Sequence, residues 1–489
     1  MDSLEYFSLF GCSKVKRIPE FAGQMKNLSE LLLNGTGIEK LPASIERLVG
    51  LHLLSLIDCK SLVCLPSAIC SLKSLKSLSL MGCSKLDRLP KNLGEMEGLE
   101  RLELEETTIT ELPPSLSIMK NLRKLSFRGS LKLWHWSDLL RLFQRKSPNP
   151  MSLRLASLND LCSLEELDLS DRNLCEGDIP NDIGCLSSLE FLDLSGNNFE
   201  SLPPTIKLLS KLKNFKLERC KRLQQLPDLP SSRSLMVDTS NCDSLKVLSD
   251  PSTPTGFTNL YEFSFLSVNC FRLVDDEGRN NAIFSLLRRL AAQGLSPDFY
   301  QFYIVSPGSK IPEWFSNQIV GDSLMVELPL DSFSRWKGIA FCVVFADQEI
   351  NTEALDQFSC YFRITCLSEG SYCANWVTGV GEVVRDHLWL FYMPSERFRD
   401  TTSTSRRFSF ETCRGSTHGD LSEYTTTWMN VKMCGARLVY EQDLEQLTKG
   451  TLNNLKRARE YYDHDAAATG SGSGCFDKES LCKRHKEEI

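Results

Sequence analysis

The 489-residue sequence lacks the features that mark several large classes of protein. It contains no run of about 18 uncharged apolar residues, which a membrane-spanning helix needs. Its first residues, MDSLEYFSLFGCSK, hold no charged segment leading into an apolar run, so they do not resemble a secretory signal. An excess of basic residues is also missing, because the formal net charge is −7. We therefore expect no nucleic-acid partner and no membrane insertion.

Residues for catalysis or metal binding are present but are not arranged for either. The phosphate-binding pattern G-x-x-x-x-G-K-[ST] does not occur. The six histidines, at positions 52, 135, 387, 418, 464 and 485, follow no metal-ligand spacing. His387 follows Asp386, which suggests a general base, but no nucleophile is placed beside the pair. We expect no enzyme, no metal and no cofactor.

The cysteines do not form a disulfide framework. There are 19 of them, an odd number, and they are spread along the chain without a C-x-x-C pair. They are typical of small apolar residues in a reducing compartment, the cytosol or the nucleus. The glycosylation triplets that begin at Asn27 and Asn34 favour secretion instead, although such triplets often arise by chance.

The strongest signal in the sequence is an internal repeat. The pattern L-x-x-L-x-L begins at positions 4, 28, 51, 75, 99 and 122, and again at 164, 189 and 212, with steps of 23 to 25 residues. We expect a degenerate copy over 235–248 and one irregular copy between Leu122 and Leu164. The period predicts an α/β leucine-rich-repeat solenoid with a curved parallel sheet over residues 1–249.

Two further positions keep the same register. A small residue stands three places after the last strand leucine, as at Cys59, Cys83 and Thr107, where it can satisfy backbone groups of the next coil. A Leu-Pro pair follows, and proline marks where the chain leaves the strand side. No repeat buries its own leucines, so stacking stabilises each one by about 1.5–3 kcal/mol.

The residues between the strand leucines point to the concave face, which we expect to bind a partner. Four apolar residues suggest a lengthwise stripe, and an acidic group is followed by a basic group. The candidates are Phe10, Leu32, Ile57 and Met81; Arg101, Glu103, Glu105 and Glu106; Lys124 and Arg128; and Glu166, Asp168, Phe191, Asp193, Lys216 and Glu218. The alternative is that the stripe touches a neighbouring domain and the charges are only solvated.

The pattern of apolar residues in the sequence changes after the repeats. Residues 250–300 read as a linker followed by a capping helix with Ile283, Leu286, Leu287 and Leu290 on one face. Residues 301–445 hold seven or so strand-like runs without helices between them, which predicts an all-β antiparallel sandwich of the jelly-roll or Ig-like kind. The runs are 302–305, 324–328, 339–345, 358–364, 387–392, 408–411 and 430–440. A short helix and a disordered tail are expected over 446–489.

Several segments together carry a family resemblance. They are the L-x-x-L-P repeats with cysteine at the turn, LQQLPDLPSS (223–232), SNCDSLKVLS (240–249), SVNCFRL (267–273) and PGSKIPEWFSNQIVGDSLMVELP (307–329). The sequence resembles the plant TIR-type nucleotide-binding leucine-rich-repeat disease-resistance receptors. The last segment looks like the opening of their jelly-roll/Ig-like domain after the repeats, which is called C-JID.

The resemblance implies a function. In that family the repeats and the sandwich are expected to capture a pathogen effector and to help hold the receptor inactive. The partners would be the effector and the receptor's own nucleotide-binding and NAD-cleaving TIR modules. Those modules are missing from this sequence, so we interpret it as a fragment or truncated product that can sense but not signal. In the sandwich signature, Ile311, Trp314 and Phe315 are expected in the core, and the polar Lys310, Asn317 and Gln318 are candidate effector contacts.

Two other interpretations stay open. The segment EGDIPNDIGCLSSLEFLDLSGNN (176–198) is also typical of extracellular repeat receptors. The second open interpretation is a scaffold that binds endogenous proteins, because a concave face does not identify its ligand.

Overall fold

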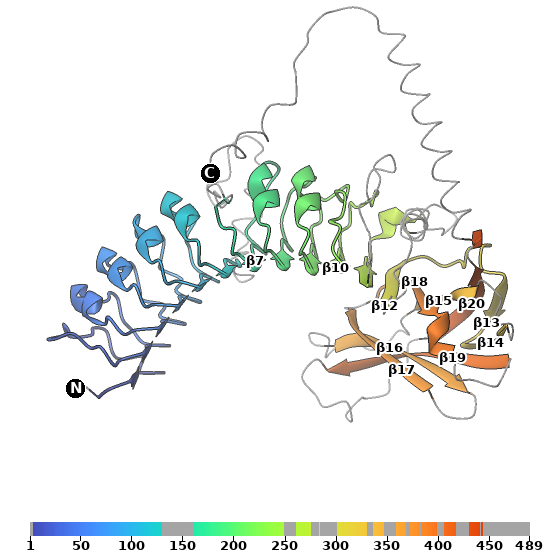
Figure 1. The fold of residues 1–489 in the computed structure, drawn as a ribbon, viewed down its shortest axis with the longest axis horizontal. Coiled ribbons are helices and arrows are strands. Elements are labelled where there is room, and N and C mark those ends of the chain that lie inside the picture. The colour runs from blue at the N-terminus through green and yellow to red at the C-terminus, as the bar shows by residue number, and fades with distance from the viewer. Residues whose placement is uncertain are drawn as a thin grey trace, which may run out of the picture.

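The computed structural model describes residues 3–129, 158, 160–248, 261–274, 283, 301–329, 336–346, 358–367, 372–380, 383–398, 405–416, 430–440 and 442–443. They form a curved array of coils followed by a β-sandwich (Figure 1). The leucine-rich-repeat solenoid and the antiparallel sandwich predicted from the sequence are both confirmed.

Each coil of the solenoid contributes one short parallel strand to the inner side of the arc and, in most coils, a 3-10 helix to the outer side (Figure 1). The strands are β1 (Tyr6–Ser8), β2 (Glu30–Leu32), β3 (Leu53–Ser55), β4 (Ser77–Ser79), β5 (Arg101–Glu103), β6 (Lys124–Ser126), β7 (Glu166–Asp168), β8 (Phe191–Asp193), β9 (Asn214–Lys216) and β10 (Ser234–Asp238). The 3-10 helices are η1 (Ala43–Arg47), η2 (Ser67–Ser71), η3 (Leu93–Glu95), η4 (Pro114–Ile118), η6 (Asn181–Cys185) and η7 (Pro204–Leu208).

The periodic leucines build the core between these two sides. Leu54, Leu78 and Leu102 lie at matching positions of neighbouring strands and are completely buried. The small turn residues close the coils as predicted, since the thiol of Cys59 donates to the Leu33 carbonyl at 3.1 Å and that of Cys83 to the Leu56 carbonyl at 3.2 Å. The coils therefore hold one another through both apolar contact and hydrogen bonds.

The irregular repeat expected between Leu122 and Leu164 adds no strand to the described sheet. Strand β6 pairs directly with β7, with Lys124 opposite Glu166 and Ser126 opposite Asp168. Residues 130–157 lie outside the described residues. Two strands that hydrogen-bond to each other leave no room for a third between them, so the predicted irregular repeat supplies no strand between β6 and β7.

The sheet does not stop where the repeats end. Strand β11 (Glu262–Leu266) pairs in parallel with β10 and with β12 (Gln301–Pro307), and the helix η8 (Phe271–Leu273) follows β11. Beyond β12 the same sheet continues with β18 (His387–Pro394), β15 (Trp336–Ala346), β20 (Asn430–Tyr440) and β13 (Asn317–Val320), all antiparallel. Residues 262–273, which the sequence placed within the linker and capping-helix segment 250–300, thus form a further coil.

A second sheet completes the sandwich. Its order is β14 (Ser323–Glu327), β19 (Ser405–Ser416), β16 (Phe358–Leu367) and β17 (Tyr372–Val380), and the helix η9 (Ser395–Phe398) follows β18. Strands β13 and β17 were not among the predicted runs. Ile283, one of the residues expected in the capping helix, is helical and fully buried. The other residues predicted for that helix and the predicted tail over 446–489 lie outside the described residues.

The second sheet packs on the concave side of the first. Leu266 and Val305 continue the row of concave positions that begins in the repeats, yet both lie in the sandwich core with Phe341, Trp389 and Phe408. On the other side of the same sheet, Phe263, Phe302 and Leu390 join the core of the solenoid. The second sheet therefore stands below the inner surface of the arc at its C-terminal end (Figure 1).

Candidate interaction surface

The concave face of β1 to β10 carries its side chains in three rows that run across the strands. Strand pairing fixes the first two rows, and the third lies two residues further along each chain segment. The first row holds Tyr6, Glu30, Leu53, Ser77, Arg101, Lys124, Glu166, Phe191, Asn214 and Met236. The second holds Ser8, Leu32, Ser55, Ser79, Glu103, Ser126, Asp168, Asp193, Lys216 and Asp238. The third holds Phe10, Asn34, Ile57, Met81, Glu105, Arg128, Ser170, Ser195, Glu218 and Ser240.

The four apolar candidates do not make one continuous stripe. Leu32 lies in the second row, whereas Phe10, Ile57 and Met81 lie in the third. Asn34 separates Phe10 from Ile57 in that row, and its Oδ1 accepts the backbone N–H of Ile57 at 3.1 Å. Phe10 is 73% exposed, and the other three are half-buried. The N-terminal part of the face is thus apolar in two offset rows.

The step from acidic to basic residues is a set of ion pairs. The ammonium of Lys124 lies 3.5 Å from a carboxylate oxygen of Glu103 on one neighbouring strand and 3.5 Å from one of Glu166 on the other. Arg101 stands beside Lys124 in the first row. Because β6 and β7 are adjacent in space, residues 42 positions apart in sequence meet here.

Two carboxylates near these ion pairs, those of Glu105 and Asp168, lie in surroundings that disfavour their charged forms. Desolvation raises the pKa of Glu105, with repulsion from Glu103 and Asp168 adding to it. Desolvation also raises the pKa of Asp168, to which Asp193 contributes. Oε2 of Glu105 finds no hydrogen-bond partner among the described residues. A cation placed against these groups would stabilise their charged forms.

A repeated D-x-S pattern orients three aspartates of the second row. Oδ1 of Asp168, Asp193 and Asp238 each accepts the backbone N–H of the serine two residues on, at 2.9 Å in every case. Asp238 lies nearest to the sandwich, and desolvation followed by repulsion from Glu218 raises its pKa to about 7. These bonds fix the carboxylates in place without neutralising them.

A second ion cluster, around Asp171, was not among the predicted sites. The Asp171 side chain is 4% exposed and lies 3.8 Å from the guanidinium of Arg128 and 3.5 Å from that of Arg219. Arg219 also pairs with Glu218 at 3.5 Å, so Arg128 and Glu218 belong to one network. Asp171 has a φ of 55° at the turn position that Gly35, Gly82 and Gly196 occupy in other coils, so an aspartate at a repeat position that often holds glycine is the sequence signal that would have identified it.

The remaining solenoid candidates lie apart from these clusters. The ammonium of Lys216 lies 5.9 Å from the centre of the Phe191 ring, a cation–π distance. Glu106 is exposed and adopts φ 56° at the turn where neighbouring coils carry Gly82 and Gly35. Holding a glutamate in this conformation costs about 1–2 kcal/mol.

The sandwich signature is more internal than expected. Ile311 and Phe315 are buried and Trp314 packs against the core, as predicted. Asn317 and Gln318 lie in strand β13, where Gln318 donates to the carbonyls of Pro312 and Phe315 at 3.0 and 2.9 Å. The Asn317 amide donates to the Met325 carbonyl at 2.7 Å. Their side-chain amides therefore hold the signature turn.

All three polar candidates in the signature, Lys310, Asn317 and Gln318, are exposed.

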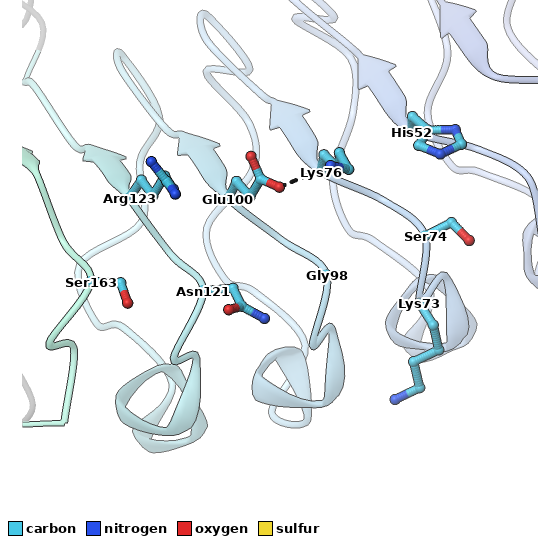
Figure 2. A pocket seen from close by; sticks show the side chains of 9 residues that line it. All are labelled: His52, Lys73, Ser74, Lys76, Gly98, Glu100, Asn121, Arg123 and Ser163. Carbon is cyan, nitrogen blue, oxygen red and sulfur yellow. Dashed lines mark hydrogen bonds and ion pairs between the residues drawn. The ribbon is translucent and has the colours of Figure 1, made fainter.

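A shallow groove of about 430 Å³ runs along the edge where the chain enters the strands (Figure 2). It is lined by His52, Lys73, Ser74, Lys76, Gly98, Glu100, Asn121, Arg123 and Ser163. Each of its cations has a carboxylate close by: Lys73 with Glu97 at 3.9 Å, Lys76 with Glu100 at 3.1 Å and Arg123 with Glu165 at 3.0 Å. The groove offers neither a strong net charge nor a catalytic pair.

Within the described ranges, no three histidine, cysteine or acidic side chains gather in a way that would hold a metal ion. The helices in the same part of the chain are all too short or too polar to span a bilayer.

Comparison with known proteins shows which proteins the chain resembles. Two family models match, a C-JID domain over residues 306–445 and a Leucine Rich Repeat over 188–209. Disease resistance-like protein DSC1 of Arabidopsis thaliana is 32% identical over 75% of this chain, and TMV resistance protein N of Nicotiana glutinosa is 31% identical over 91% of it. Over most of its length this chain is similar to plant disease resistance proteins. The resemblance to their TIR-type, nucleotide-binding members is thereby confirmed.

The match covers only part of each related receptor. The chain spans 30% of the length of DSC1, 37% of N and 33% of the Arabidopsis thaliana disease resistance protein RPS4B, to which it is 26% identical. Solved structures with similar repeats include a leucine-rich-repeat protein of Leptospira interrogans (24% identity, 56% of this chain and 71% of that one, TM-score 0.33). Another is the repeat domain of the type III effector XopL (19% identity, 61% and 75%, TM-score 0.31). They add nothing on function.

Proposed function

We propose that this chain is the effector-sensing region of a plant immune receptor and that it recognises a pathogen protein without catalysing a reaction. The concave face and the adjoining sandwich would bind the effector. In the absence of the effector, the same region would help hold the nucleotide-binding and TIR modules of a full receptor inactive. We place this activity in the cytosol or the nucleus.

The observation that carries the proposal is the group of neighbouring carboxylates on the concave face, where Oε2 of Glu105 has no hydrogen-bond partner among the described residues and desolvation raises the pKa of Glu105, Asp168 and Asp238. A protein loses stability by holding such groups close together and desolvated. A partner that presents lysine or arginine side chains would lower these pKa values and recover that free energy. We therefore infer that the effector surface is basic where it meets β5 to β10, and apolar where it meets Phe10, Ile57 and Met81.

The acidic part of this surface can be tested by charge reversal. We expect Glu103, Glu105 and Glu106 changed together to lysine to abolish the effector-triggered response of a full-length receptor that carries this region. Circular dichroism and thermal unfolding of this chain with the same substitutions would show whether the fold is intact.

A matched control reverses the same number of charges elsewhere. Glu95, Glu97 and Glu111 are exposed acids outside the three rows of the concave face, and their change to lysine should leave the response unaltered. An unchanged response in the first variant, with normal expression, would remove the acidic patch from the recognition surface.

A further inference from the structure

At the junction between the solenoid and the sandwich, a histidine side chain accepts a hydrogen bond that a carbonyl of the following coil accepts elsewhere in the solenoid. In successive coils, the backbone N–H of the turn residue donates to a carbonyl of the following coil: Arg219 to Ser240 at 2.8 Å and Asn241 to Val268 at 2.7 Å. The next turn residue is Asn269, which has the same left-handed φ of 60°. Its N–H donates instead to Nε2 of His387 at 2.9 Å.

The Asn269 side chain joins the same two parts of the molecule. Its Nδ2 donates to Oδ1 of Asn241 in the preceding coil at 3.0 Å, and its Oδ1 accepts the N–H of Val384 from the sandwich at 3.1 Å. These three bonds link Asn269 to the preceding coil on one side and to Val384 and His387 of the sandwich on the other. Asparagine suits the site because it tolerates a positive φ and offers both a donor and an acceptor.

The contacts of His387 determine its tautomer. A backbone N–H can only donate, so Nε2 must accept and cannot carry a proton. The proton is then on Nδ1, which donates to the Arg385 carbonyl at 2.8 Å. The ring is completely buried, with the Phe271 and Phe345 rings 5.8 and 6.0 Å away between centres. A neutral ring with one fixed donor and one fixed acceptor matches this site.

We propose that Asn269 and His387 form a latch that ends the hydrogen-bond ladder of the solenoid and fixes the sandwich to it. His387 is a positioning residue in this proposal. Without its acceptor, the partly buried Asn269 N–H would lose this hydrogen bond, and the β11 coil would loosen together with the segment before β18. The latch does not depend on the proposed function, because it concerns the free chain.

Hydrogen exchange measured by mass spectrometry tests the latch on the whole chain. His387→Phe keeps an aromatic ring but removes the acceptor. We expect exchange of the amides in 262–273 and 383–390 to become at least about tenfold faster, with no change over β2 to β4. His387→Gln offers a carbonyl oxygen near the position of Nε2 and should restore most of the protection. His52→Phe, at an exposed histidine, is the control and should change neither segment.

Two results would overturn the latch. One is unchanged exchange in His387→Phe, and the other is a His387→Gln chain as unprotected as His387→Phe. If His387→Phe does not fold, nitrogen NMR of histidine-labelled wild-type chain decides the matter. A histidine with a protonated Nδ1 and a bare Nε2 that stays neutral at pH 5 is expected, and an Nε2-protonated or freely titrating His387 contradicts the proposal.

Discussion

Two side chains near the C-terminal end of the solenoid, those of His387 and Asp238, make its stability depend on pH, and they do so in opposite directions. Desolvation lowers the pKa of His387 to about 4, so its contribution to stability is present above about pH 6.5 and is lost as the pH falls towards 4. The charges that face this region are Arg385, which stacks on Phe271, and Asp386, which pairs with Lys432 at 2.6 Å. Asp238 acts in the other direction.

The pKa of Asp238 is about 7 in the folded chain, against about 3.9 when unfolded. Its favourable contribution is therefore complete below about pH 4 and is lost as the pH rises through 7. Asp238→Asn keeps the Oδ1 acceptor for Ser240 and removes the charge. We expect the variant to be more stable than wild type at pH 8, by roughly 1 kcal/mol or more, and nearly equal at pH 4. Urea unfolding at both pH values measures this difference.

Asp243 supplies the control for that comparison. Its side chain is 61% exposed and pairs with Lys221 at 3.8 Å, so Asp243→Asn should change stability little at either pH. Equal stability of wild type and Asp238→Asn at pH 8 would mean that Asp238 is not under electrostatic strain.

At the scale of elements, the contact between the β5 and β7 coils depends on one buried arginine. Arg172 follows β7 and is 9% exposed, and its guanidinium donates to the carbonyls of Thr107 and Ile109 in the β5 coil. The guanidinium also lies 3.9 Å from the centre of the Phe127 ring. Desolvation lowers its pKa to about 10, so it stays charged at neutral pH. The side chain thus reaches past the β6 coil.

We expect Arg172→Met to keep most of the packing volume but to leave two buried carbonyls without their donor. The free energy of unfolding should fall by roughly 1–3 kcal/mol. Thermal and urea unfolding would measure the change. Arg88→Met, at a side chain that is 79% exposed, is the control and should have almost no effect. A loss no larger than that of the control would show that Arg172 does not bridge the coils.

The repeats could be predicted from the sequence because every coil repeats the same chemistry at a fixed spacing. Leu54, Leu78 and Leu102 needed only the period to be placed in the core. The apolar stripe was misjudged for a local reason: Leu32 lies two residues before the position of Phe10 and Ile57, and so faces outward in a different row. Counting each candidate from its own strand leucine would have separated the two rows.

Other features have no local signal. All four residues of β13 are exposed, so the strand shows no alternation of apolar and polar residues. The pairing of β11 with β12 brings the Phe263 and Phe302 rings to 5.8 Å, although they are far apart in sequence. Likewise, Lys124 meets Glu166 only because β6 and β7 are neighbours. Such contacts depend on the folded topology and not on a period.

At the scale of the whole molecule, the cysteines distinguish a reducing from an oxidising origin. None of the described cysteines forms a disulfide, and the turn cysteines Cys59, Cys83 and Cys220 are buried, with desolvation raising the pKa of Cys83 to about 12. We expect iodoacetamide to modify the exposed Cys12, Cys162 and Cys185 in the native chain and to spare the buried thiols. Mass spectrometry after labelling would identify the modified sites.

Complete unfolding without a reducing agent extends this measurement. If nearly all 19 cysteines then react, the reducing-compartment interpretation is supported. Disulfide-linked peptides among the described cysteines would instead favour the extracellular interpretation.

The position of the second sheet makes the two ends of the inner surface of the arc different. The second sheet lies at the C-terminal end of the inner surface, whereas the exposed Phe10 lies at the N-terminal end. An elongated binding partner would contact this sheet with only one of its two ends. The length of such a partner, measured from the end that contacts the sheet, would decide which strands it reaches.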